Sequence, residues 1–339
     1  MLPCKGLSLI FLPLIFTLHS IPTISTDPIL YDIYPFIRVY KNGTIQRFIG
    51  QDFAPPSTDP STAVRSKDVK FSPQLNLTAR LYLPTNSAAG RKLPLLIYFH
   101  GGGFFTESAF SPTYHHHLTS LVARAQIVAV SVNYRLAPEH LLPTAYQDSW
   151  VALKWAFSHY GGKGSEPWLN SYANFEYLYL GGDSAGGNIA HRMAIRVGLE
   201  NPGGGIKVKG MFLNCPYFLG KKAIGNESAN ANVYAETQMQ KLWEHAYPKS
   251  AGLDDPMVNP GMDPGLKMVG CKRVLVYVAG NDVLKWRGEY YAAALGRSGW
   301  KGEVKVVEVE GENHVFNLIN PNSSKAIAML RVLASFLNH

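Results

Sequence analysis

Short apolar runs recur along the chain and are separated by longer segments in which apolar residues have helical spacing. Several of the runs are continuous, which is typical of strands buried on both faces of a parallel sheet. These runs lie at residues 95–99, 127–132, 177–180, 208–213, 274–279 and 304–309. Residues 77–83 instead alternate between apolar and polar positions and predict an edge or antiparallel strand. Helices are predicted at residues 114–125, 145–158, 188–199 and 324–336.

Strands that alternate with helices predict an α/β fold, with a mostly parallel central sheet and helices on both faces. Two regions break this rhythm. Residues 26–75 are irregular, aromatic and proline-bearing, and they predict an N-terminal strap. Residues 219–265, with one clear helical segment at 232–246, predict an insertion. We expect strap and insertion to form a cap near the carboxyl ends of the strands, where ligands bind in such sheets, and residues 76–339 to form the main domain that carries the site.

Composition and charge narrow the function classes. With 339 residues, of which 46% are apolar, the chain is long enough to form one large α/β domain. The formal net charge is +8, but the basic residues are scattered and form no run with interleaved aromatics, so nucleic-acid binding is not expected. The sequence has no Cys-x-x-Cys motif and no Cys/His ligand spacing, so no metal centre is expected. Cys215 and Cys271 could form a disulfide or remain two buried thiols.

The N-terminal residues differ from the rest of the chain. Lys5 precedes an apolar stretch at residues 7–18, and Ser and Thr residues follow, which is the layout of a secretory signal peptide at residues 1–25. The stretch is shorter than the about 20 residues that a membrane-spanning helix needs, so no stable membrane span is expected. This interpretation predicts a secretory or extracellular protein. The alternative is an apolar strap that packs on the body of a cytoplasmic protein.

The motif Gly182-Asp183-Ser184-Ala185-Gly186 follows one predicted strand and precedes a predicted helix. A serine at such a sharp turn projects above the end of the sheet as a nucleophile, and its strained backbone requires small neighbours. The motif alone is weak, because a chain with 31 glycines can match it at an ordinary strand-to-helix turn. The residues that could assist the serine decide between the two interpretations.

A second glycine-rich segment, His100-Gly101-Gly102-Gly103, comes directly after the predicted strand at 95–99. Consecutive glycines leave their backbone N–H groups unshielded, so these groups can bind the oxyanion that develops when a carbonyl is attacked. The N–H group of Ala185, next to the serine, would supply a further donor. The sequence therefore predicts an oxyanion hole formed by this loop and Ala185.

A nucleophilic serine also needs a base, and the base needs a carboxylate that orients it. His314 follows the predicted strand at 304–309, and Asp282 follows the one at 274–279. The adjacent histidines at 115–117 are expected to have surface or packing roles. His191 would lie about 10 Å from Ser184 along the helix axis, too far for a hydrogen bond. The sequence thus predicts a triad of Ser184, His314 and Asp282.

Several motifs in this order resemble the plant carboxylesterases of the hormone-sensitive-lipase-like group, which have the α/β-hydrolase fold. They lie at residues 100–104, 133–139, 181–188, 282–284 and 314–316, and the likeness extends from about Tyr34 to the C-terminus. The apolar segment at the N-terminus departs from most members of that group.

The resemblance implies a role for each matching residue. Ser184 would be the nucleophile, His314 the base and Asp282 its orienting carboxylate. The oxyanion hole would include residues 101–103 and Ala185, with N–H donors from Gly102, Gly103 and Ala185 and with Gly101 and His100 shaping the loop.

These expectations together describe an esterase that cleaves a small-molecule carboxylic ester through an acyl-enzyme, without a metal or organic cofactor. Phe104, Phe105 and Tyr217 are expected to line the substrate pocket or, alternatively, to pack in the core. Two other functions stay open, since the same group contains dehydratases that act on isoflavonoids and gibberellin receptors that have lost the triad histidine. The presence of His314 favours an enzyme over a receptor.

Overall fold

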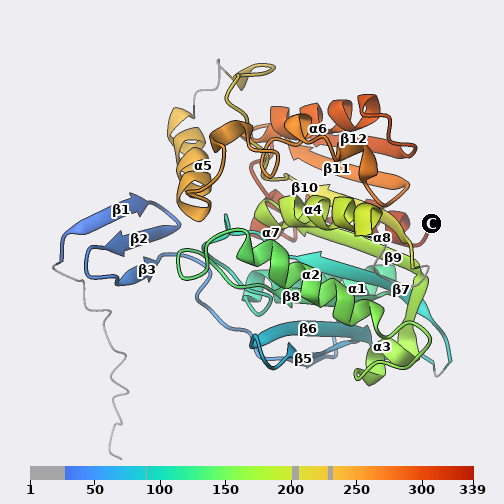
Figure 1. Ribbon diagram of the computed structural model, residues 1–339. Helices are drawn as coiled ribbons and strands as arrows, with labels where there is room; N and C mark the ends of the chain where they lie inside the picture. The colour runs from blue at the N-terminus through green and yellow to red at the C-terminus, as the bar shows by residue number, and fades with distance from the viewer. Residues whose placement is uncertain (1–26, 89, 201–205, 228–231) are drawn as a thin grey trace, which may run out of the picture.

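The computed structural model describes residues 27–88, 90–200, 206–227 and 232–339. Within these ranges, nine strands form one sheet in the order β12-β11-β10-β9-β7-β8-β6-β5-β4 (Figure 1). The strands from β12 to β8 pair in parallel, and β6, β5 and β4 add to them in antiparallel fashion, which confirms the predicted sheet. The strands are β4 (Thr58–Asp59), β5 (Val64–Ser72), β6 (Leu77–Pro84), β7 (Leu93–Phe99), β8 (Val128–Asn133), β9 (Ala173–Asp183), β10 (Val208–Asn214), β11 (Arg273–Ala279) and β12 (Glu303–Val309).

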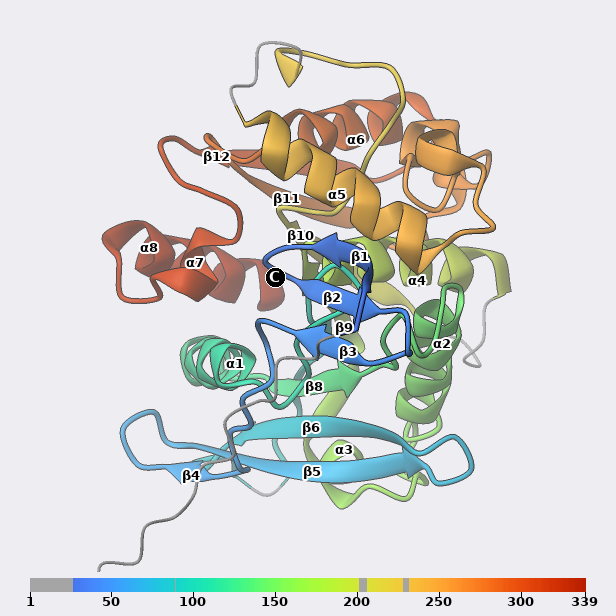
Figure 2. The same ribbon diagram turned by 90° about the vertical axis from the view of Figure 1, so that its left-hand side faces the viewer.

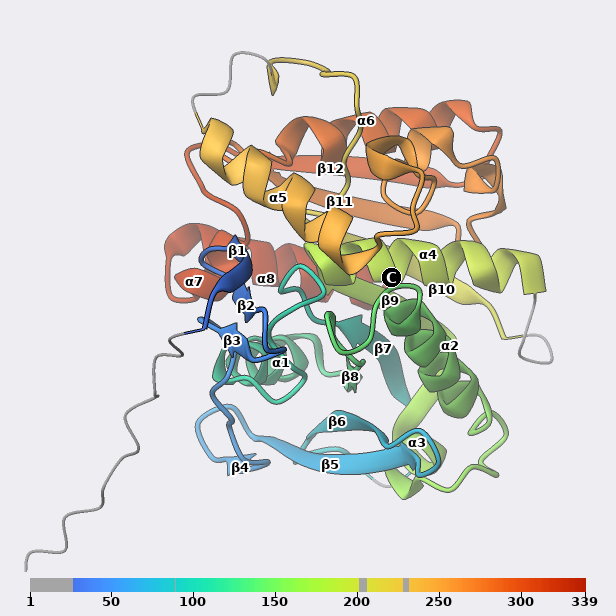
Figure 3. The ribbon, with the colours of Figure 1, turned by 60° about the vertical axis from the view of Figure 1, so that its left-hand side comes forward.

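Helices cover both faces of this sheet (Figure 3). In β7, Leu95 belongs to one buried apolar cluster and Leu96 to the other, because successive side chains of a strand point to opposite faces. The Leu95 cluster contains side chains of α2 (Thr144–Phe157), α4 (Ala185–Glu200) and α6 (Lys285–Arg297). The Leu96 cluster contains side chains of α1 (Pro112–Ala125) and α8 (Ser324–Leu337). Shorter helical segments are α3 (Pro167–Tyr172), α7 (Phe316–Ile319), η2 (Gly252–Asp254), η3 (Pro260–Met262) and η4 (Leu266–Met268).

Three details differ from the sequence predictions. β12 is an edge strand with partly exposed residues and is not buried on both faces, because in the described structure it pairs only with β11. The sheet begins with β4 and β5, inside the range 26–75 that the sequence assigns to the strap, since the charged residues of β5 conceal its strand pattern. The sequence pattern also misses α6. Gly288 lies inside that helix and weakens its helical sequence pattern, and it allows close packing because a Cβ there would lie 2.6 Å from a Val278 methyl group.

A small antiparallel sheet and one helix lie together near one end of the main sheet (Figure 2). The small sheet consists of β1 (Ile29–Ile33), β2 (Ile37–Tyr40) and β3 (Ile45–Arg47), and the helix is α5 (Val233–Ala246). The rings of Tyr31 and His245 have centroids 4.2 Å apart, and the Tyr234 hydroxyl donates a hydrogen bond of 3.0 Å to the carbonyl of Tyr34. These contacts join two segments that are distant in the sequence.

A buried ion pair ties the segment before α5 to α6. The Arg287 guanidinium donates to both carboxylate oxygens of Glu227, at 2.6 and 2.7 Å, and also to the carbonyls of Gly220 and Lys222. Both charged side chains are buried. Since Asp282 lies just before α6, this pair fixes the segment before α5 to the part of the fold that carries Asp282.

Three further expectations concern the N-terminal signal peptide, a membrane-spanning helix and a disulfide bond. The predicted signal peptide, residues 1–25, lies outside the described residues. In the part of the chain that is described, no helix has both the length and the apolar character needed to cross a bilayer. Cys215 and Cys271 are free buried thiols, so of the two alternatives the structure has the unpaired one.

We expect Arg287→Met to lower the free energy of unfolding by about 3 kcal/mol, because it leaves the Glu227 carboxylate buried without its partner. The matched control is Lys325→Met, which breaks the partly exposed pair with Glu312 and should cost less than about 1 kcal/mol. Urea unfolding of the three proteins tests this. Equal losses in the two variants would contradict a structural role for the buried pair.

Candidate active site

Ser184 lies in the sharp turn between β9 and α4, with a backbone φ of +49°. The residues two positions before and after it, Gly182 and Gly186, must be glycine for steric reasons. A Cβ at Gly186 would lie 2.0 Å from the carbonyl oxygen of Phe99, and one at Gly182 would lie 2.3 Å from the carbonyl oxygen of Gly186. The backbone of Ser184 is fixed by hydrogen bonds from its N–H to the carbonyl of Asn214 and from Tyr217 N–H to its own carbonyl, both 2.9 Å. The turn is therefore a rigid, strained elbow.

The glycine loop after β7 lies against this elbow. Gly102 has a φ of +91°, and a Cβ there would lie 2.1 Å from the Thr106 carbonyl oxygen. Among the described residues, the N–H groups of Gly102, Gly103 and Ala185 have no protein acceptor. Both glycines border the cavity that Ser184 also borders. These three donors are thus available to an anion at Ser184.

Gly101 differs from the two glycines that follow it. Its N–H donates a hydrogen bond of 2.8 Å to the Tyr114 hydroxyl, so it is not free to bind an oxyanion. This bond agrees with the expectation that Gly101 shapes the loop while Gly102, Gly103 and Ala185 supply the donors, and the place of these residues in an oxyanion hole stays a prediction. His100 is also a shaping residue, since its ring stacks on Tyr134 at 4.2 Å. Burial lowers the pKa of His100 to about 4, so the ring is neutral at physiological pH.

Asp183 connects the elbow to the glycine loop through two tyrosines that the sequence analysis did not identify. Its carboxylate accepts hydrogen bonds from Tyr98 at 2.7 Å and from Tyr114 at 2.8 Å, and the Tyr114 hydroxyl in turn accepts from Gly101 N–H. Burial raises the pKa of Asp183 to about 6, although the two hydrogen bonds act in the opposite direction. Through Tyr114, Asp183 thus fixes the position of the glycine loop relative to the turn that carries Ser184.

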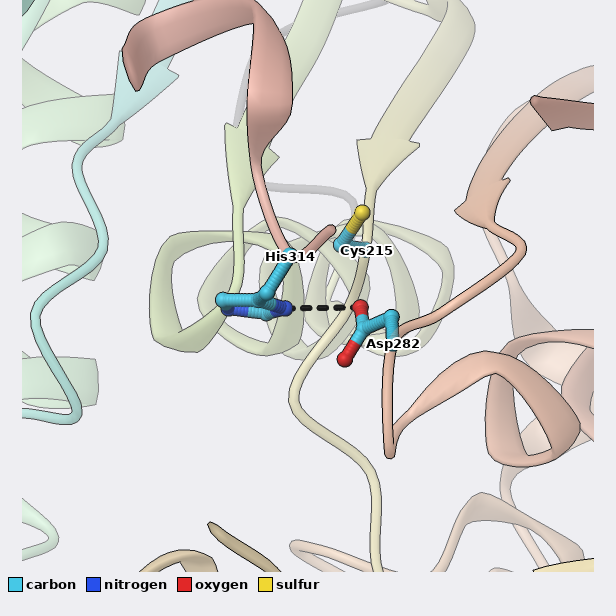
Figure 4. A group of neighbouring side chains, drawn as sticks. All are labelled: Cys215, Asp282 and His314. Carbon is cyan, nitrogen blue, oxygen red and sulfur yellow. Dashed lines mark hydrogen bonds and ion pairs between the residues drawn. The ribbon is translucent and has the colours of Figure 1, made fainter. Parts of the chain in front are cut away.

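His314 and Asp282 meet where the loops after β12 and β11 converge (Figure 4). His314 Nδ1 lies 2.7 Å from Asp282 Oδ2, and the other carboxylate oxygen accepts the N–H of Leu284 at 3.0 Å. The two loops are joined by Asn281, whose backbone N–H donates to the carbonyl of Glu312 at 2.8 Å. Since Nδ1 is engaged with Asp282, the ring has Nε2 left for another partner.

The pKa of His314 reflects two opposed effects. Burial by itself would lower it, but the charge and hydrogen bond of Asp282 outweigh burial and raise the pKa well above 6.5. Cys215 lies beside this pair (Figure 4), and burial raises the pKa of its thiol. Within the described residues, Cys215, Asp282 and His314 are the only group whose ligand atoms are close enough to hold a metal ion together. A protonated thiol and an engaged Nδ1 make this a poor ligand set.

Ser184 and His314 border one cavity of about 440 Å³. In the described structure no hydrogen bond joins the Ser184 hydroxyl to the His314 ring. Such bonds are often long without substrate and shorten when it binds. Most of the remaining lining is apolar and comes from the β1–β3 segment, α5 and the segment after His314. It includes Phe36, Ile49, Met239, Leu242, Leu318 and Ile319.

The expected pocket residues Phe104, Phe105 and Tyr217 do not line this cavity, so that prediction is wrong and their core alternative holds. All three are almost fully buried, and the ring of Phe104 packs edge-on against Tyr217 at 5.8 Å. Phe104 has a φ of +71°, a backbone conformation that its sequence position does not reveal. The residues of the β1–β3 segment and α5 that do line the cavity belong to no sequence motif, so they could not be predicted from the sequence.

Comparisons with known proteins agree with this architecture. A family described by its alpha/beta hydrolase fold matches residues 96–318. The chain is 50% identical over 315 residues to probable carboxylesterase 1 of Arabidopsis thaliana, covering 91% of this chain and 97% of that protein. It is 40% identical to 2-hydroxyisoflavanone dehydratase of Glycyrrhiza echinata, covering 94% and 99%. A solved structure, the hyperthermophilic esterase of the archaeon Pyrobaculum calidifontis, superposes with a TM-score of 0.65 at 26% identity, covering 80% and 85%.

We expect the His314 imidazole to titrate above pH 6.5 and the Asp282→Asn variant to titrate below it, because the charge of Asp282 is then lost and burial, the largest single effect on the ring, lowers its pKa. Proton and nitrogen NMR of labelled imidazoles measures this, with His314→Gln to assign the signal. The folded pKa is raised, so the pair's contribution to stability is complete below the unfolded pKa and is lost as the pH rises through the folded pKa. A wild-type pKa at or below 6.5 would contradict the expected balance.

Proposed function

The chain belongs to the α/β-hydrolase fold family and, within it, to the plant carboxylesterases, and from this premise we propose that it hydrolyses carboxylic esters through Ser184, His314 and Asp282. One observation supports this most strongly. The strained serine, an Asp-held histidine and the glycine N–H groups without acceptors all border one largely apolar cavity. Covalent catalysis by serine requires this combination of nucleophile, oriented base and oxyanion donors.

In the proposed reaction, Ser184 Oγ attacks the ester carbonyl carbon while its proton passes to His314 Nε2. The carbonyl oxygen becomes an oxyanion that accepts the N–H groups of Gly102, Gly103 and Ala185. When the tetrahedral intermediate collapses, the alcohol leaves with the proton from Nε2, and the acyl group remains on Ser184. A water molecule, deprotonated by His314 Nε2, then attacks this acyl-enzyme, and the acid leaves as Ser184 Oγ takes that proton back from Nε2. Asp282 keeps Nδ1 protonated throughout.

The cavity indicates the kind of ester that fits. Its volume of about 440 Å³ suits a small organic molecule, and its lining is mostly aliphatic and aromatic. A short to medium acyl or alcohol group of low polarity is therefore the favoured substrate, and a long lipid chain would not fit inside.

A second function deserves a direct test, because the dehydratase of Glycyrrhiza echinata is similar over nearly its whole length. In that alternative, His314 would remove a proton from the substrate and the oxyanion donors would stabilise the developing enolate, so that water leaves. Analysis of products from a 2-hydroxyisoflavanone separates this elimination from ester cleavage. A receptor without turnover is less favoured, because the Asp282–His314 pair is intact.

We expect Ser184→Ala to lower kcat for 4-nitrophenyl acetate by about 10⁴-fold or more, because the acyl-enzyme can no longer form. Ser158→Ala is the matched control, since it removes an exposed hydroxyl at the end of α2. Steady-state kinetics after a check of folding by circular dichroism measures both. Turnover by the Ser184 variant equal to that of the control would refute the serine mechanism.

We expect Tyr114→Phe to lower kcat about 10-fold with little change in KM, because Gly101 then loses the hydroxyl that positions the oxyanion loop. Tyr98→Phe is its control. That variant also removes one hydrogen bond to Asp183 but leaves the bond to Gly101 intact, so it should have the smaller effect. The role assigned to Tyr114 would be wrong if both variants lost the same activity.

A further inference from the structure

Glu107 borders the same cavity as Ser184 and His314, but the reaction described above does not use it. Its backbone has a φ of +69°, which is unusual for a residue other than glycine. Gly50, from the N-terminal segment, packs against it so closely that a Cβ at Gly50 would lie 2.4 Å from Glu107 N. The position of Glu107 is therefore imposed by two segments of the fold.

The carboxyl group of Glu107 is incompletely satisfied. Its Oε2 atom is buried and, in the described structure, has no hydrogen-bond partner. Burial raises the pKa of Glu107, a hydrogen bond from Ser111 lowers it, and the charge of Asp52 raises it further. An unpartnered buried carboxylate oxygen is costly, and native structures rarely keep one without a reason.

A carboxylate in this cavity is also unfavourable for the proposed chemistry. The cavity must stabilise a developing oxyanion at Gly102 and Gly103, and a negative charge nearby opposes that. Much of the remaining lining is apolar and offers Glu107 no donor. The carboxyl group is thus a cost to catalysis unless the substrate itself brings a donor to it.

We propose that Glu107 is a specificity residue that accepts a hydrogen bond from a hydroxyl group on the ester substrate. This inference rests on the proposed esterase function and narrows it to hydroxyl-bearing esters. The Oε2 atom has almost no exposed surface, but rotation about the terminal torsion of glutamate is soft and can bring an oxygen to the cavity edge.

A hydroxyl group suits this position better than an amine. A hydroxyl brings one donor, which one uncommitted carboxylate oxygen satisfies without transfer of another charge into the cavity. An ammonium group brings three donors and a full charge, and the apolar lining cannot replace the water that it would lose.

The test compares kcat/KM for paired esters that differ only in one hydroxyl. One series has 4-nitrophenyl esters of 2-, 3- and 6-hydroxyalkanoic acids, each beside the unsubstituted ester of equal chain length, and the other has butanoates of diols beside those of simple alcohols. In the wild-type protein, at least one hydroxylated ester should be favoured by about 10-fold or more, as expected for a hydrogen bond to a charged acceptor.

Two variants at Glu107 and one control complete the design. Glu107→Gly removes the carboxyl and tolerates the positive φ, so the preference should fall to about one. Glu107→Gln keeps a neutral acceptor of the same size and should retain a weaker preference of about 2- to 10-fold. Asp52→Asn removes a nearby exposed charge that does not border the cavity, and it should keep the wild-type preference.

The possible results separate this inference from the function on which it rests. If the wild-type protein cleaves the plain esters but prefers no hydroxylated ester, or if its preference survives in Glu107→Gly, the role of Glu107 is refuted and the esterase function stands. If Asp52→Asn loses the preference as fully as Glu107→Gly, the effect is one of general charge and the inference also falls. If the wild-type protein cleaves no ester, both fall.

Discussion

The site depends on a steric constraint, the contact between the backbone at the end of β7 and the elbow that carries Ser184. Atoms approach there so closely that only glycine fits, since a Cβ at Gly186 would lie 2.0 Å from the Phe99 carbonyl oxygen. β7 and β9 are neighbours in the sheet, so their carboxyl ends are side by side. The close contact holds the glycine loop after β7 against the serine, with no side chain between them. The N–H groups proposed as oxyanion donors are thereby positioned by backbone packing, before any substrate binds.

Electrostatics sets the second condition, because acidic groups surround a site that would have to bind a developing anion in the proposed reaction. Asp282 is paired with the His314 ring, and Asp183 accepts hydrogen bonds from two tyrosines. These partners stabilise the negative charges of the two carboxylates. Glu107 lacks such a complete set of partners, which distinguishes it from the other two acids.

The sequence was sufficient to predict the parts of the site that follow directly from strands. Ser184, Asp282 and His314 each come just after an apolar run, and parallel strands bring such positions to one edge of the sheet. Tyr114 could not be predicted in this way, because its role depends on how α1 packs against the elbow. The core position of Phe104, whose backbone is left-handed, could not be predicted either. The lining residues Phe36 and Met239 come from segments that are far apart in the sequence and adjacent only in the folded chain, so no local pattern identifies them.

Because reacting groups and cavity lining come from different parts of the fold, similar chains can have different activities. The proposed reacting groups lie on loops that follow strands of the main sheet, whereas the large apolar side chains that line the cavity come from the β1–β3 segment, α5 and the segment after His314. Substitutions at lining positions such as Met239 or Leu242 can alter the shape of the cavity without moving Ser184 or its partners. A carboxylesterase at 50% identity and a dehydratase at 40% can thus share one scaffold, because the scaffold fixes the reactive atoms and the lining decides which bond is presented to them.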